Sequence, residues 1–80
     1  MIHNLKILPE HFSPVVSGRK KAELRNNDRG FNEGDYLELR EYMPGVGFTG
    51  RFVVRKVIHV ADVSAYLPGF VLLSMEKLDD

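Results

Sequence analysis

Residues 17–31, Ser-Gly-Arg-Lys-Lys-Ala-Glu-Leu-Arg-Asn-Asn-Asp-Arg-Gly-Phe, contain the pattern on which the predicted fold depends. Positions 21–25 alternate between charged and apolar residues, which is the two-residue period of a half-buried β-strand. This period predicts a strand over 20–25 whose Ala22 and Leu24 side chains point towards a core. A glycine near each end of the stretch favours a turn there.

The same strand carries the charged residues from which a site is predicted. Lys21, Glu23 and Arg25 are expected on its outward face, and Lys20 stands at its entry. Residues 19–29 have a net charge of +3 in a chain that is neutral overall. We expect this face to form one wall of a binding cleft. The alternative is a solvated face that protects an edge strand against unwanted pairing.

Length and composition limit the class of protein. Eighty residues predict one domain, residues 1–80, with a small core. The absence of cysteine excludes disulfides and thiolate metal sites. His3, His11 and His59 lie in three different predicted elements without metal-ligand spacing, so we expect surface or half-buried imidazoles, no metal and no cofactor. No apolar run is long enough to cross a membrane, which predicts a soluble cytoplasmic protein.

Periodicity along the rest of the chain predicts a small β-rich fold. The predicted strands are 3–8, 20–25, 35–41, 51–60 and 69–75, and the predicted helix is 9–17. Five short strands with one main helix favour a mainly β (α+β) fold with one or two short helices, arranged as a small five-stranded barrel. We expect a frayed chain end at Leu78-Asp79-Asp80.

Two irregularities refine this prediction. Lys56 falls on the same face as Val54 and Ile58 of strand 51–60, which indicates either a β-bulge or a strand that bends around a barrel. Pro14 should kink or shorten the helix, and Phe31 should attach the loop 26–34 to the core. The predicted core consists of Leu5, Ile7, Phe12, Val16, Leu24, Leu37, Leu39, Val54, Ile58, Val71 and Leu73.

Four residues of the opening stretch also match a known signature. Gly18, Lys20, Glu23 and Arg25 have the spacing Gly-x-Lys-x-x-Glu-x-Arg, which resembles the signature of ASCH domains in the PUA-like superfamily of small β-barrels. The run 25–35 resembles, more specifically, an uncharacterised ASCH-like family of short bacterial and phage proteins. Further similarities lie at 3–10, 39–42, 49–51 and 69–74, so the resemblance covers nearly the whole chain. It implies a PUA-like barrel, in agreement with the periodicity.

A second basic segment supports a binding function. Residues 40–56 also have a net charge of +3, so a meeting of the two segments would create a surface suited to phosphate. We therefore predict an RNA- or nucleotide-binding domain with a basic cleft beside strand 20–25. The predicted binding residues are Lys20, Lys21, Glu23, Arg25, Asn27, Asp28, Arg29, Arg40 and Arg51. Tyr36, Tyr42, Phe48 and Tyr66 are candidates for base stacking, with ordinary packing as the alternative.

The resemblance also implies an enzymatic alternative. Some bacterial ASCH proteins are amidohydrolases on N4-acetylcytidine, in which a lysine activates a threonine nucleophile and a glutamate assists. Lys20 matches the lysine, but Glu23 stands at the threonine position, and the segment with the assisting glutamate has no counterpart in this shorter chain. The remaining Lys20–Glu23 pair would offer a general base or simply a salt bridge. A third hypothesis is a protein-interaction module whose loop 26–30 contacts a partner protein.

Overall fold

The computed structural model describes residues 1–78 of the chain. The elements are β1 (Ile2–Ile7), α1 (Pro9–Val16), β2 (Ala22–Asn26), β3 (Tyr36–Met43), β4 (Gly47–Asp62) and β5 (Phe70–Lys77). The predicted mainly β class with one short helix is confirmed. Strand β4 begins four residues earlier than predicted, because a tight turn, closed by the Val46 N–H on the Met43 carbonyl, joins it to β3. Residues 79–80 of the predicted frayed end lie outside the described part.

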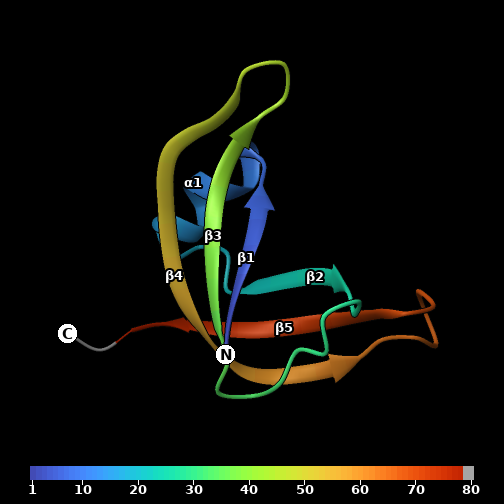
Figure 1. Cartoon of the computed structure of the whole chain (residues 1–80). Helices are drawn as coiled ribbons and strands as arrows, with labels where there is room; N and C mark the ends of the chain where they lie inside the picture. Colours follow the sequence, from blue (N-terminus) through green and yellow to red (C-terminus); the bar gives the residue numbers. More distant parts are fainter. Residues whose placement is uncertain (79–80) are drawn as a thin grey trace.

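The strands form one curled sheet in the order β1-β3-β4-β5-β2. Strand β4 makes the curl possible, since residues 47–56 pair with β3 whereas residues 55–62 pair with β5 (Figure 1). The predicted bulge is present as a register shift between Val57 and His59. The sheet is therefore a half-barrel with β1 and β2 at its two edges, and α1 packs against β3.

The core lies on the inner side of this curl. Seven of the predicted core residues are buried: Leu5, Ile7, Phe12, Leu37, Leu39, Val71 and Leu73. The buried set also contains Val15, Phe31, Val57 and Met75. The burial of Phe31 confirms that it attaches its loop to the core.

Three predicted core residues are exposed, and a fourth is only half-buried. Ile58 faces outwards because the inward residues of this part of β4 are Val53, opposite Leu39, and Val57, which continues the same alternation. The register shift comes after Val57 and moves the inward phase to Val60, opposite Leu73. Val16 is exposed because the buried stripe of α1 consists of Phe12 and Val15. Val54 lies in a strand, as predicted, but its side chain is only half-buried.

The third exposed residue shows that the predicted orientation of β2 is wrong. Leu24 is 50% exposed and lies opposite Leu72 on the outer face of the sheet. Glu23 is 6% exposed and lies opposite the buried Leu73. Because the side chains of a strand alternate between its faces, the charged face of β2 points into the curl.

The end of α1 places Lys20 beside this inward face. Gly18 has a φ of +82°, a conformation that glycine adopts without strain, and it ends the helix. The Pro14 carbonyl then accepts hydrogen bonds from the N–H groups of Arg19 and Lys20, at 2.9 and 3.0 Å. The helix is only eight residues long, and this turn brings the chain directly to β2.

We predict that leucines on the two faces of the sheet differ strongly in their contribution to stability. Leu73→Ala should lower the free energy of unfolding by about 2–5 kcal/mol, because it leaves a cavity in the core. Leu72→Ala and Leu24→Ala should each cost less than about 1.5 kcal/mol. Urea denaturation of the three variants measures these values. A cost for Leu24→Ala as large as that for Leu73→Ala would contradict the observed orientation of β2.

Candidate functional site

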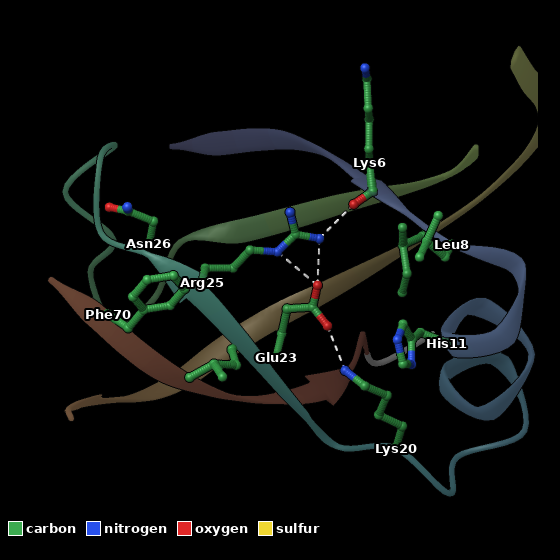
Figure 2. A pocket seen from close by; sticks show the side chains of 10 residues that line it. Lys6, Leu8, His11, Lys20, Glu23, Arg25, Asn26 and Phe70 are labelled. Carbon is green, nitrogen blue, oxygen red and sulfur yellow. Dashed lines mark hydrogen bonds and ion pairs between the residues drawn. The ribbon is translucent and has the colours of Figure 1, made fainter. Parts of the chain in front are cut away.

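A buried carboxylate organises the inner side of β2. Glu23 accepts a hydrogen bond from Lys20 Nζ at 2.5 Å on Oε1, and from Arg25 Nε at 2.8 Å on Oε2 (Figure 2). Arg25 Nη2 lies 2.5 Å from the same Oε2 atom and donates to the Lys6 carbonyl of β1 at 2.6 Å. We call Lys20, Glu23 and Arg25 the Glu23 cluster. It links the two edge strands, which are not neighbours in the sheet order.

A second arginine makes a similar link. Arg29, in the loop after β2, donates from Nη1 to the Asn4 carbonyl at 3.0 Å. Two carbonyl groups at the edge of β1 are thus satisfied by guanidinium groups instead of by another strand. Arg25 keeps one terminal nitrogen, Nη1, that points away from Glu23 in Figure 2. Both arginines therefore support the fold and still present donors to the surface.

An open pocket of about 570 Å³ adjoins the Glu23 cluster. Its volume lies in the range of small-molecule sites. Figure 2 shows His11 of α1 and Leu8 on one side and Lys20, Glu23 and Arg25 on the other. The full lining is Lys6, Ile7, Leu8, His11, Lys20, Glu23, Leu24, Arg25, Asn26 and Phe70. We call this space the β2 pocket.

A smaller hollow of about 320 Å³ shares Lys6 and Arg25 with the β2 pocket. It is lined by Asn4, Leu5, Lys6, Arg25, Arg29, Arg40 and Phe48, and we call it the four-cation hollow. No acidic residue belongs to this described lining. The two basic segments of the sequence meet at this hollow, since Arg25 and Arg29 come from the first and Arg40 from the second.

Other predicted site residues have different positions. Arg51 binds Glu41 through Nε and Nη2, at 2.9 and 2.8 Å, and its guanidinium lies 5.1 Å from the Phe12 ring centre. Lys21 lines another hollow together with Ile58 and Lys77, and this hollow shares Lys20 with the β2 pocket. These positions place both cations outside the β2 pocket and the four-cation hollow.

The loop after β2 holds the remaining two predicted residues. Asn27 accepts a hydrogen bond from the Phe31 N–H on Oδ1 at 3.2 Å, and its own N–H donates to the Gly69 carbonyl. Asn27 therefore shapes the loop, whereas the side chain of Asp28 is largely exposed. Asn27 thus acts as a turn-forming side chain, a role that is common for asparagine.

The structure also contains two buried acids that sequence reasoning missed. Glu41 accepts hydrogen bonds from Arg51 and Thr49, which hold its pKa below the usual value. Asp35 lies 2.8 Å from His3 Nε2, and this hydrogen bond is the main cause of the lowered pKa of Asp35. Both effects follow from bonds that favour the charged carboxylate.

The alternation of inward and outward residues along each strand could have identified these groups from the sequence. Glu41 continues the inward phase of Leu37 and Leu39, and His3 continues that of Leu5 and Ile7. His3 is 4% exposed, so the prediction of a surface or half-buried imidazole was wrong for this residue. Within residues 1–78, no group of three His, Cys, Asp or Glu side chains could hold a metal ion. No described helix is long and apolar enough to cross a membrane.

We predict that the fork of Arg25 contributes to stability. Arg25→Lys should lower the free energy of unfolding by about 1–3 kcal/mol, because an ammonium group cannot bind Glu23 and the Lys6 carbonyl with the same geometry. Arg40→Lys is the matched control, since Arg40 pairs only with the partly exposed Glu38 among the described residues, and it should cost less than about 1 kcal/mol. Urea denaturation measures both. Equal costs would contradict the bridging role of Arg25.

Acid should destabilise the protein through Asp35 and Glu41. Their pKa values in the fold lie below the unfolded values of 3.8 and 4.5. The ionised groups therefore stabilise the fold fully above these values, and this contribution is lost as the pH falls through the lower folded-state pKa. We expect the free energy of unfolding to decrease below about pH 4.5 in urea titrations. Glu41→Gln should be less stable at pH 7, and its free energy of unfolding should decrease less steeply as the pH falls. A pH dependence parallel to that of the wild type would contradict this account.

Comparison with known proteins places the chain in a family. The chain is 43% identical over 72 residues to the "Uncharacterized 12.9 kDa protein in GpA 3'region" of Escherichia phage P2. That match covers 90% of this chain and 65% of the phage protein, so the chain spans about two thirds of its relative. The family model described as "Domain of unknown function (DUF3850)" matches residues 2–75. The chain therefore belongs to the DUF3850 family.

Proposed function

We propose that this protein binds RNA or a nucleotide-like ligand in the cleft beside β2. The observation that carries the proposal is the junction of the β2 pocket with the four-cation hollow, through Lys6 and Arg25. A pocket with apolar walls suits a base or nucleoside, and an adjoining cationic hollow without lining acids suits phosphate. A cytoplasmic location is part of the proposal.

The proposal also includes membership of the ASCH group of PUA-like domains. Three residues of the resembling signature, Lys20, Glu23 and Arg25, form one hydrogen-bonded cluster at the pocket. A curled five-stranded sheet with one short helix is compatible with such a barrel. Both observations support this relationship.

The cations of the cleft differ in how strongly other groups hold them. Lys6 Nζ lies 4.5 Å from the centre of the Tyr42 ring, a cation–π contact, and it makes no ion pair within residues 1–78. Within residues 1–78, Arg29 donates a hydrogen bond to the Asn4 carbonyl, and its Nε lies 3.9 Å from Oδ1 of the exposed Asp28. We therefore assign phosphate contacts to Lys6 and Arg29 first, and to the outward nitrogen of Arg25.

The geometry favours binding over amide hydrolysis. Both oxygens of Glu23 accept hydrogen bonds from cations, which occupy the lone pairs that a general base needs. The described lining of the β2 pocket contains no serine or threonine that could act as a nucleophile. An amidohydrolase would have to release Glu23 from Lys20 or Arg25 before it could act. The protein-interaction hypothesis has less support, because Asn27 and Arg29 tie the loop 26–30 to the body of the protein.

We predict salt-dependent binding of single-stranded RNA. With about three to five phosphate contacts, the slope of log K against log salt should be roughly −2 to −3.5. Lys6→Ala should weaken binding and make the slope less negative by roughly 0.7. Lys56→Ala is the charge-matched control and should leave the slope unchanged, because Lys56 lines neither the β2 pocket nor the four-cation hollow. Fluorescence anisotropy with an RNA hexamer measures these values, and salt-independent or absent binding would overturn the proposal.

Incubation with N4-acetylcytidine separates binding from the enzymatic alternative. The binding proposal expects no release of acetate, as followed by chromatography. Turnover that disappears in Glu23→Gln would instead support the amidohydrolase and contradict a purely bridging role of the Glu23 cluster.

A further inference from the structure

Two phenylalanines stand exposed on the β3–β4 hairpin. Phe48 and Phe52 are each 55% exposed, although both belong to β4. Phe52 lies opposite Arg40 in the sheet, and Phe48 lies opposite Tyr42. Since Arg40 and Phe52 alternate with the inward-facing Leu39 and Val53, they belong to the outer face of the sheet.

The position of Phe48 is fixed by its neighbours. Its ring meets that of Tyr42 edge-on, with centroids 5.2 Å apart and an interplanar angle of 72°. Lys6 Nζ lies within 6.0 Å of the Phe48 ring centre. An aromatic ring held in this way keeps one surface open for stacking without a large loss of side-chain entropy.

The two phenylalanines flank a third space, the hairpin hollow. It has a volume of about 300 Å³ and is lined by Arg40, Phe48, Gly50, Arg51 and Phe52. Gly50, with a φ of +92°, lies between the two phenylalanines where the pairing with β3 shifts its register. Arg40 and Arg51 are held in place by Glu38 and Glu41. The hollow thus presents two rings and two oriented guanidinium groups.

The three spaces adjoin one another. The β2 pocket and the four-cation hollow share the lining residues Lys6 and Arg25, and the four-cation hollow and the hairpin hollow share Arg40 and Phe48. Cations therefore line the surface between Lys20 and Arg40, and exposed rings follow at Phe48 and Phe52. Cations next to rings differ from the continuous apolar patch that marks a typical protein interface.

We propose that the ligand of the cleft is a single RNA strand of several nucleotides, which continues onto the hairpin and stacks its bases on Phe48 and Phe52. This inference rests on the proposed function. It adds that the ligand is single-stranded and that the hairpin is a second contact surface. Stacking on a side chain requires an open base face, which a duplex does not offer. Phosphate contacts along a cationic path combined with stacking rings are typical of single-strand binding.

The test compares oligouridines of two and eight nucleotides by fluorescence anisotropy. The wild-type protein should bind the longer strand at least roughly tenfold more tightly, because only this strand reaches the hairpin. Phe52→Ala should weaken binding of the eight-mer by roughly tenfold and leave the dinucleotide within about twofold, because Phe52 lines only the hairpin hollow. Phe48→Ala should weaken binding of the eight-mer by at least as much, because Phe48 also lines the four-cation hollow. Phe48→Trp should retain the affinity, because it keeps a ring. Tyr66→Ala is the matched control, since Tyr66 is exposed but lines none of the three spaces.

The outcomes separate this inference from the proposed function. If the eight-mer binds no tighter than the dinucleotide and the phenylalanine variants bind like the wild type, while Lys6→Ala still weakens binding, the extended path is wrong and the proposed function stands. If neither strand binds, both fail. Tighter binding of a duplex of the same length would overturn the single-strand inference. Phe48-dependent self-association in sedimentation, without an effect on RNA, would make the hairpin a protein interface and also overturn it.

Discussion

The Glu23 carboxylate connects two edges of the sheet that no strand pairing connects. Strands β1 and β2 lie at opposite ends of the strand order, and Arg25 bridges them by binding Glu23 and the Lys6 carbonyl together. A buried carboxylate requires charged or hydrogen-bonding partners, so Glu23 keeps Lys20 and Arg25 at the opening of the curl. The shape of the opening therefore depends on an ion-pair cluster.

This way of closing the sheet leaves a cleft with cationic walls. A further strand on β1 would cover the carbonyls of Asn4 and Lys6 and present no charge. In this protein Arg29 and Arg25 bind these carbonyls. The Arg29 side chain is 46% exposed, and Nη1 of Arg25 points away from Glu23 (Figure 2). The groups that stabilise the edge are thus the groups that make the cleft basic, and stability and ligand binding are coupled at these positions.

The length of β4 adds the second feature of the molecule. Because β4 runs through both halves of the sheet, its first part extends with β3 as a projecting hairpin (Figure 1). That hairpin carries Phe48 and Phe52 on its outer face, beside Arg40. On the binding proposal, the curl supplies the cleft and the hairpin supplies the surface over which a longer ligand continues.

The sequence by itself predicted the five strands and the helix close to where they lie, because a two-residue period and helical spacing are local features. It also identified most of the core and the charged cluster around β2. It did not give the inward phase of β4, in which Val53 and Val57 face the core and Lys56 lies on the outer side. The same period could not decide which face of β2 points inwards. It places Glu23 and Leu24 on opposite faces but does not say which of the two faces the core. That choice depends on Lys20, Arg25 and the distant edge of β1, which only the tertiary structure brings together. Pairing between distant segments likewise decided that Arg25 meets Arg40 while Arg51 is bound to a buried acid.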